Sequence, residues 1–389
     1  MSSSTPGSPT TRTLHLAVDL TDAGAHPAAW RTLGSQARQL FDADRLQDLV
    51  STAQRGTVDL VLFDDAFSLQ PGRRGGVQGR LDAALVAARL APRSEGVGLV
   101  PTVTTTHTEP FHVSKALATI DHASHGRAGW QVAVSTGADD AAHVGRRQAP
   151  DVAAAWAEAA EAIDVVSRLW DSWEDDAEIR DVETGRFVDR DKLHYVDHDG
   201  VHFAVKGPSI TPRPPQGHPV VVVRVDSDAA LAVAAEHADV VRVRATTLEE
   251  ARALREQVRS AAADHGRDPD DVIVLVDLYA VIGPDRASAQ ARLDLLEGLA
   301  GVSWDTDSYT HVGTDRDLAV TAEEWFLAGA ADGFTVRPSS LQTDLVALVD
   351  GVVPLLRRAG IYRTEYTGTT LRDSLGLARP ANRYAAAIA

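Results

Sequence analysis

The chain has 389 residues, of which 44% are hydrophobic and 24% charged, proportions typical of a globular protein that can bury a full core. Its 55 acidic and 38 basic residues give a formal charge of -17, which disfavours binding to nucleic acid or to an anionic membrane because like charges repel. The sequence contains no cysteine, so disulfides, cysteine-based zinc sites and thiol chemistry are excluded.

Residues 1–12, MSSSTPGSPTTR, contain no apolar stretch, so we expect a disordered tail rather than a signal peptide. Nowhere does the sequence reach the ~18 consecutive apolar residues that a membrane-spanning helix requires. We therefore expect a cytoplasmic protein with no membrane partner.

Short apolar segments are predicted to form eight strands. Most are continuous runs of Val, Leu and Ile, as is typical of strands that are buried on both faces of a parallel sheet. In chain order the predicted strands are 14–20, 58–63, 96–103, 129–135, 219–225, 239–245, 271–280 and 333–336.

Segments of helical periodicity lie between and after these strands. They are 36–54, 80–90, 111–124, 153–169, 229–237, 248–264 and 341–358. Eight alternating units predict the α/β class, and a (β/α)8 TIM barrel rather than a doubly wound sheet. We expect residues 13–389 to form this single domain.

Two longer stretches, about 171–218 and 284–325, interrupt the alternation. Insertions in such barrels usually lie on the C-terminal-face loops, above the active site. The first stretch contains KGPSITPRPPQGHP, whose proline and glycine content disfavours regular structure and favours a loop across the barrel mouth. The second contains an amphipathic piece, AEEWFLAGAADGF, that leads into the last strand.

One long motif carries a family resemblance. The segment TVTTTHTEPFHVSKALATIDHASHGRAGWQVAVS (102–135) resembles the bacterial luciferase-like flavin monooxygenases, in the branch of the nitrilotriacetate and dibenzothiophene-sulfone monooxygenases. The resemblance continues in RLWDSWEDDA, HYVDHDGVHFAVKGPSITPRPPQGHPVV, EWFLAGAADGF and YRTEYTGTTLRDSLGLARPANRY. It thus covers nearly the whole chain after the tail.

The resemblance implies an FMNH2-dependent, two-component monooxygenase. A separate flavin reductase would supply reduced FMN, which would react with O2 to give a flavin peroxide that oxygenates a small organic substrate. The protein would hold the flavin in a dry cavity and orient the substrate. The absence of a GxSxG nucleophile motif agrees with chemistry carried by a cofactor. The resemblance also implies a homodimer.

Positions that match the family motif give candidate site residues. Asp65 would lie near the flavin after the second strand, although a carboxylate there could also cap the next turn. Thr104 and Thr106 could bond the flavin pyrimidine edge, or reflect β-propensity followed by a turn. Gln131 replaces a family Asn, and its carboxamide could meet a flavin carbonyl and N3–H. His107 replaces a family Tyr and is the catalytic candidate, unless it is a solvated loop histidine.

The features that hold the FMN phosphate in the family are altered here. After the fifth strand the chain reads RVDSDAA without the expected glycines, which would let backbone N–H groups approach a phosphate. Asp226 and Asp228 would repel that phosphate. Arg224, Ser227 and Trp156, which lies near the place of a family Tyr, are the candidate contacts. Either Arg224 compensates the charge, the phosphate binds by another route, or FMN binding is weakened or lost.

Two sets of histidines have spacings that are compatible with binding of a metal ion. Because both sets fall in stretches that match the family, we expect no metal. The sets are His122 with His125, and His194 with His198 and His202.

Two rival functions remain open. One is a barrel that uses the deazaflavin F420 for hydride transfer. The other is a non-catalytic barrel subunit beside an active paralogue, which the altered phosphate-binding turn favours. Loops at the barrel mouth are expected to determine which substrate is bound.

Overall fold

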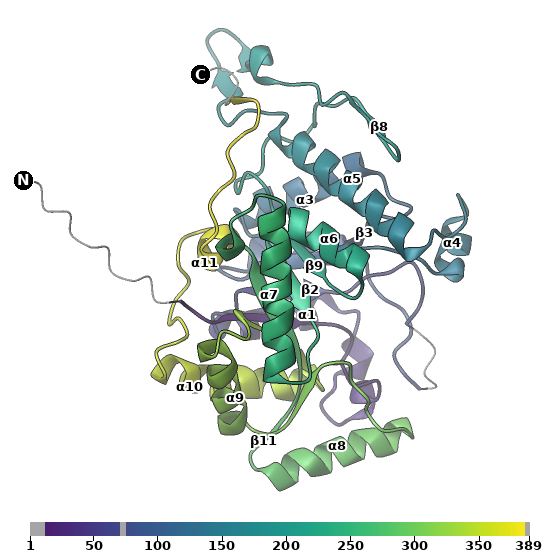
Figure 1. Cartoon of the computed structure of the whole chain (residues 1–389), viewed down its shortest axis with the longest axis vertical. Helices are drawn as coiled ribbons and strands as arrows, with labels where there is room; N and C mark the ends of the chain where they lie inside the picture. Colours follow the sequence, from purple (N-terminus) through teal and green to yellow (C-terminus); the bar gives the residue numbers. More distant parts are fainter. Residues whose placement is uncertain (1–11, 71–74, 386–389) are drawn as a thin grey trace, which may run out of the picture.

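The computed structural model describes residues 12–70 and 75–385. Eight parallel strands close into a barrel at the centre of the molecule, and the pairing of β13 with β1 closes the ring (Figure 1). Each predicted strand overlaps one of them, so the predicted TIM barrel is confirmed. The barrel strands are β1 (His15–Asp19), β2 (Leu60–Phe63), β3 (Gly98–Thr104), β4 (Gly129–Ala133), β9 (Val220–Arg224), β10 (Val240–Val243), β11 (Ile273–Gly283) and β13 (Gly333–Pro338).

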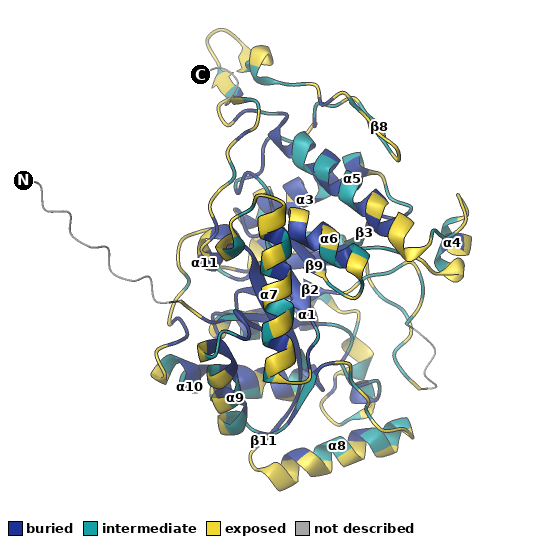
Figure 2. Cartoon of the chain, viewed as in Figure 1, coloured by how far each residue is buried: buried dark blue, intermediate teal, exposed yellow. Residues whose placement is uncertain are grey.

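Helices surround the barrel, and several begin at the capping residues that the sequence supplies. Ser227 and Thr247 accept hydrogen bonds from the first turns of α6 and α7. Figure 2 shows α7 with an exposed outer stripe over buried strands, as its alternation of alanine and charged residues requires. The α-helices are α1 (Ala43–Arg55), α2 (Ala83–Leu90), α3 (Pro110–Ser124), α4 (Ala138–Val144), α5 (Val152–Asp171), α6 (Asp228–His237), α7 (Leu248–Asp264), α8 (Arg286–Ala300), α9 (Asp315–Leu327), α10 (Val353–Arg358) and α11 (Leu371–Leu375).

Short helical turns fill several connections. Two π-helical turns, Leu341–Leu345 and Leu348–Val352, precede α10, so the predicted helix 341–358 is wound differently over its first part. Single 3-10 turns occur at Ala29–Arg31, Ala37–Gln39, Ala91–Arg93, Arg190–Lys192 and Pro269–Asp271.

The N-terminal end of the barrel lumen is closed by the C-terminal part of the chain. Leu371, Leu375 and Leu377 belong to one buried cluster with lumen residues such as Val100. A Cβ added to Gly98, at the start of β3, would lie 2.6 Å from a methyl carbon of Leu371, so the strand begins with glycine where the plug contacts it. We call residues 371–377 the C-terminal plug.

The segment 171–218 does not cross the barrel mouth, contrary to the expectation from its composition. It connects the end of α5 to the beginning of β9, and connections from helix to strand lie at the N-terminal end of such a barrel. Its last part is held there because the Gln216 side chain donates to Asp121 at 2.6 Å and to the Ala128 carbonyl, just before β4, at 2.8 Å. Proline and glycine content indicated an irregular loop but not which end of the barrel it covers.

The same segment carries two small hairpins, which Figure 1 shows beyond α5, toward the end of the molecule that holds the C-terminus. They pair β5 (Glu178–Asp181) with β6 (Arg186–Val188), and β7 (His198–Asp199) with β8 (Ala204–Val205). Glu161 of α5 holds the second hairpin, because it lies 2.9 Å from Nε2 of His198 and accepts from the backbone N–H of Phe203 at 3.0 Å.

The second interrupting stretch, 284–325, is largely regular. It contains α8, the additional strand β12 (Tyr309–Thr314) and most of α9. β12 pairs in parallel with the second half of β11, whereas β10 pairs with its first half. The connection 301–308 follows α8 and returns to the C-terminal end of the barrel, where it contributes to the pocket described below.

The expected tail, 1–12, lies outside the described residues except for Arg12, which forms an ion pair with Asp332 at 3.0 Å. Among the helices of the described ranges, none has the length and apolar character needed to cross a membrane. The assignment of 13–389 to one domain stays a prediction.

Candidate active site

Charged side chains occupy the C-terminal end of the lumen, which we call the barrel mouth. Asp19 ends β1, Arg242 lies on β10, Asp277 on β11 and Arg337 on β13. Arg242 forms two hydrogen bonds of 2.9 Å with the Asp277 carboxylate, and Nε of Arg337 lies 3.2 Å from Asp19. We call these four residues the charged layer; its two cations and two anions balance each other.

The charged layer extends across the mouth on both sides. Toward β4, Arg242 donates to the Gln131 carboxamide oxygen at 2.6 Å. Toward the 301–308 connection, Arg337 donates to the Tyr279 hydroxyl oxygen, and this hydroxyl donates to Asp307 at 3.0 Å. One continuous set of polar contacts therefore spans the mouth from β4 to the connection before β12.

Burial and neighbouring charges define the protonation states in this layer. Burial alone would raise the pKa of Asp19, but Arg337 and Arg242 hold it below its ordinary value. Burial raises the pKa of Tyr279 to about 12. Burial opposes the charge of Arg337, yet Asp19 and Asp277 raise its pKa. At neutral pH, Asp19 is therefore anionic, Arg337 is cationic and Tyr279 keeps its proton.

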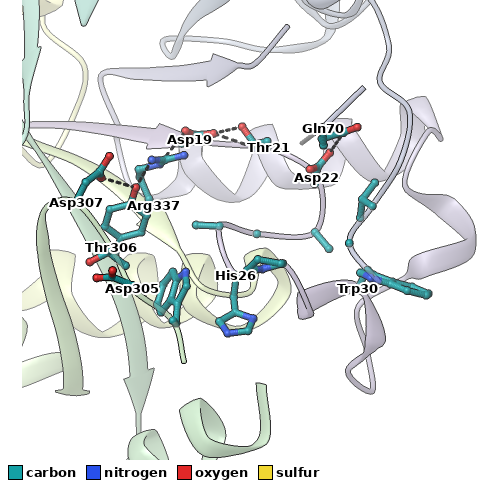
Figure 3. A pocket seen from close by; sticks show the side chains of 18 residues that line it. Asp19, Thr21, Asp22, His26, Trp30, Gln70, Asp305, Thr306, Asp307 and Arg337 are labelled. Atoms are coloured by element: carbon teal, nitrogen blue, oxygen red, sulfur yellow. Dashed lines mark hydrogen bonds and ion pairs between the residues drawn. The ribbon is translucent and has the colours of Figure 1, made fainter. Parts of the chain in front are cut away.

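A pocket of about 430 Å³ opens beside the charged layer (Figure 3); we call it the mouth pocket. Three aromatic rings pack together in its wall: Trp304 lies 5.2 Å from His26 and 5.4 Å from Tyr279, measured between ring centroids. Its lining consists of Asp19, Thr21, Asp22, Ala23, Gly24, Ala25, His26, Pro27, Trp30, Gln70, Gly76, Val77, Tyr279, Trp304, Asp305, Thr306, Asp307 and Arg337.

None of the site residues predicted from the sequence lines the mouth pocket. Thr104 and Gln131 lie on the neighbouring strands β3 and β4, and Gln131 uses both ends of its carboxamide on Arg242 and Thr102. Thr106 accepts a hydrogen bond from the backbone of Ser135 at 3.0 Å. Gln131 therefore links β4 to β3 and β10, and Thr106 links the segments that follow β3 and β4.

His107 follows β3 in a left-handed backbone conformation, with φ of 68°. Its ring lies 6.2 Å from that of Phe67 in an edge-to-face arrangement. Burial, followed by the charge of Arg147, lowers its pKa, so the imidazole is neutral at neutral pH. A neutral ring near the mouth is compatible with the predicted contact to substrate, which stays a prediction.

The other candidates have structural partners. Asp65 accepts from the backbone of Ala83, the first residue of α2, at 2.9 Å, which is the capping role considered as its alternative. Trp156 is 4% exposed and packs in the main hydrophobic core. Ser227 caps α6, and Arg224 lies 3.7 Å from Asp226.

The histidines considered as metal ligands have other neighbours. Nε2 of His194 lies 2.7 Å from Glu174, and Nε2 of His122 lies 3.2 Å from the Pro212 carbonyl. Within residues 12–70 and 75–385, no three His, Asp or Glu side chains are grouped as metal ligands would be.

Sequence reasoning missed the residues that build the mouth pocket. It also missed the charged layer beside the pocket, although two of its residues carry a signal: Arg242 and Asp277 interrupt the apolar runs VVRV and VLVDLYA, where a strand buried on both faces has no place for an isolated charge. Opposite charges on neighbouring barrel strands could have indicated a buried pair. No comparable pattern marks Trp304, because the connection that carries it has no regular structure.

Comparisons with known proteins relate this chain to one family. The model of the luciferase-like monooxygenase family matches residues 22–339. Nitrilotriacetate monooxygenase component A from Aminobacter aminovorans is 32% identical, over 93% of this chain and 96% of that protein. Subunits A and B of pristinamycin IIA synthase from Streptomyces pristinaespiralis are 30% and 32% identical, over 97% and 86% of this chain and 99% and 90% of theirs.

Among solved structures, EDTA monooxygenase from Chelativorans sp. BNC1 has the same fold, with a TM-score of 0.88 at 24% identity over 95% of this chain and 100% of that one. Fold and sequence thus agree, and the resemblance inferred from the sequence is confirmed. The chain belongs to the luciferase-like monooxygenase family.

Proposed function

We propose that this protein is an FMNH2-dependent monooxygenase that transfers oxygen from O2 to a small organic substrate, with reduced FMN supplied by a separate flavin reductase. The observation that carries the proposal is the mouth pocket, which lies at the C-terminal end of the barrel in a chain of this family. Active sites of barrel enzymes occur at this end.

The mouth pocket fits the ring system of a flavin in its chemistry. Aromatic and apolar residues of the lining, among them His26, Trp30 and Val77, offer walls for a planar ligand. Nε of Arg337 lies toward Asp19, and its Nη1 donates to the Tyr279 hydroxyl. Its Nη2 has no partner among the described residues, so it could donate to a ligand carbonyl. Reduced FMN, when bound, would supply the activation of O2, while these side chains orient the ring and exclude water.

The N-terminus of α6 does not fit a phosphate. The Ser227 hydroxyl already accepts from the backbone of Ala230 at 3.2 Å, and Asp226 and Asp228 add negative charge on either side. Arg224 is the nearby cation, but it faces Asp226 at 3.7 Å. These contacts support weak binding of FMN, as suits a flavin that arrives reduced and leaves oxidised.

The test is an anaerobic titration of the purified protein with reduced FMN, followed by mixing with O2. We expect saturable binding and a rate of flavin oxidation that differs from that of free reduced FMN. If reduced FMN fails to bind even at millimolar concentration, the proposal is wrong. Reduced F420 serves as the matched titrant, since binding of F420 without FMN would support the hydride-transfer alternative.

A second candidate is a subunit that works beside an active paralogue. It is favoured by the acidic α6 terminus, and by the match to two proteins named as subunits A and B of one synthase. Co-expression with a second barrel of the family would test it. A stable complex in which only the partner binds reduced FMN would support this candidate over the first.

A homodimer and a cytoplasmic location complete the proposal. The homodimer is inferred from the family resemblance, and sedimentation would test it. The cytoplasmic location is inferred from the sequence, and cell fractionation would test it.

A further inference from the structure

We propose that the mouth pocket binds a substrate that carries a positively charged nitrogen, as a protonated amine or a quaternary ammonium group, attached to an apolar body. The inference rests on the proposed function, because it names the substrate class of the same site. It follows from the charges and the rings that line the pocket.

The charge balance of the lining is negative. Apart from histidine, the side chains of the lining that carry charge at neutral pH are four aspartates and Arg337. Arg337 is neutralised by Asp19, and Asp307 is paired with Arg244 from outside the lining. Asp305 has no ion-pair partner in the described part of the chain. The pocket therefore retains an anionic carboxylate without a cation beside it.

The remaining aspartate lies on the other side of the pocket. Figure 3 shows Asp22 with Gln70 on one side, Asp305 and Asp307 on the other, and His26 between them. Burial raises the pKa of Asp22, and Gln70 donates to its carboxylate at 2.9 Å. Asp22 thus already has a side-chain partner, whereas the Asp305 carboxylate has neither an ion pair nor a hydrogen bond among the described residues, so Asp305 is the carboxylate left for a cation.

Aromatic surface adjoins this carboxylate. Asp305 follows Trp304 directly in the chain, and the Trp304 ring packs with His26 at 5.2 Å. A cation that lies on the indole face is attracted by the ring and by the carboxylate together. The face of Tyr279 is already covered by the Arg337 guanidinium, at 4.8 Å from the ring centroid. Of the two tryptophans in the lining, Trp304 is the one next to Asp305, so we assign it to the substrate cation.

The same lining disfavours polyanionic substrates. Nitrilotriacetate and EDTA, named for two similar proteins, are polycarboxylates. A pocket whose single guanidinium is neutralised by Asp19 offers such molecules no free cation, and Asp305 repels them. The substrate of this protein therefore differs in charge from those two.

Three probes of similar shape test the inference without flavin. Benzyltrimethylammonium is positively charged, neopentylbenzene is its neutral isostere, and phenylmethanesulfonate is an anion. Binding to the purified protein is measured by titration of tryptophan fluorescence and by calorimetry. We expect the cation to bind about tenfold more tightly than the neutral isostere, and the anion to bind least.

Variants locate the effect. Asp305→Asn should weaken binding of the cation about tenfold and leave the neutral probe nearly unchanged, whereas Trp304→Leu should weaken binding of both probes, and of the cation more strongly. Arg244→Gln should strengthen binding of the cation, because Asp307 then loses its cation. The matched control is Asp264→Asn at the exposed end of α7, which should change nothing.

Several outcomes would overturn the inference: equal or tighter binding of the anion, no binding of the cation at millimolar concentration, or equal effects of Asp305→Asn and Asp264→Asn. None of these outcomes bears on the binding of reduced FMN, so failure of the substrate class remains distinguishable from failure of the proposed function.

Discussion

Arg242 and Asp277 lie 2% and 0% exposed in the barrel mouth, where burial of a single charge would cost several kcal/mol. Two parallel hydrogen bonds of 2.9 Å and the contact with Gln131 compensate this cost. The pair therefore depends on both partners being present. Each partner sits on a neighbouring strand, so the pair also links β10 to β11 at the mouth.

Arg242→Gln should destabilise the protein by about 3–5 kcal/mol, because it leaves the Asp277 carboxylate buried without its cation. The matched variant Arg244→Gln removes an arginine two residues later whose partner, Asp307, has a half-exposed side chain. Its effect should stay below about 1 kcal/mol. Urea unfolding of both variants measures the difference, and equal losses would show that the buried pair has no special role.

A second buried carboxylate, Asp59, gives a prediction for pH. Burial alone would raise its pKa, but Arg363 and His15 hold it below the ordinary value. A carboxyl group with a lowered pKa in the folded state stabilises the fold above its unfolded pKa, about 3.9, and loses this contribution as the pH falls through the folded value.

Asp59→Asn should therefore lower the free energy of unfolding at pH 7 by about 3–5 kcal/mol, and the gap to the wild type should narrow below about pH 4. Urea titrations across this range measure it. Asp350→Asn is the control, because Asp350 pairs with Arg55 where both side chains are more than half exposed. If the difference in free energy of unfolding between Asp59→Asn and the wild type did not change with pH, the lowered pKa of Asp59 would be contradicted.

At the scale of elements, the C-terminal plug and the residues before it bind back onto the barrel. Arg363 reaches Asp59 just before β2, and Arg372 reaches Asp239 just before β10 at 2.8 Å. The plug itself buries leucines in the lumen. The last part of the chain therefore closes the N-terminal end of the barrel, while the barrel mouth stays open.

Leu371→Ala should destabilise the protein by about 2–5 kcal/mol, since it removes a fully buried side chain from the lumen floor and leaves a cavity. Leu295→Ala on α8 serves as the control, because that side chain is 55% exposed, and its effect should stay within about 0.5 kcal/mol. Chemical denaturation of the two variants compares them. Similar small effects would mean that the plug is dispensable.

Element prediction succeeded where one strand or helix carries its own pattern. The apolar runs of the barrel strands and the amphipathic period of α7 are local, so both were found. β12 was missed because its sequence, YTHVGT, has few apolar residues, and its stability comes from pairing with the far half of β11. α8 was missed because its outer position requires little apolar surface.

For the whole molecule, we expect a homodimer with twice the chain mass of 41.5 kDa. Sedimentation equilibrium at several protein concentrations measures this directly. A mass equal to one chain at all concentrations would contradict the expectation. A mass that shifts upward only with a second family member would instead favour the subunit alternative.

The sequence alone determined the (β/α)8 barrel and the family, because buried strands, helical periods and a long shared motif are local properties of the chain. It did not determine which end of the barrel the 171–218 segment covers, since composition carries no direction. Nor did it show that Asp19, Trp304 and Arg337, far apart in the chain, line one pocket. Only closure of the barrel brings them together, because neighbours across a closed sheet are set by strand order and register rather than by distance along the chain.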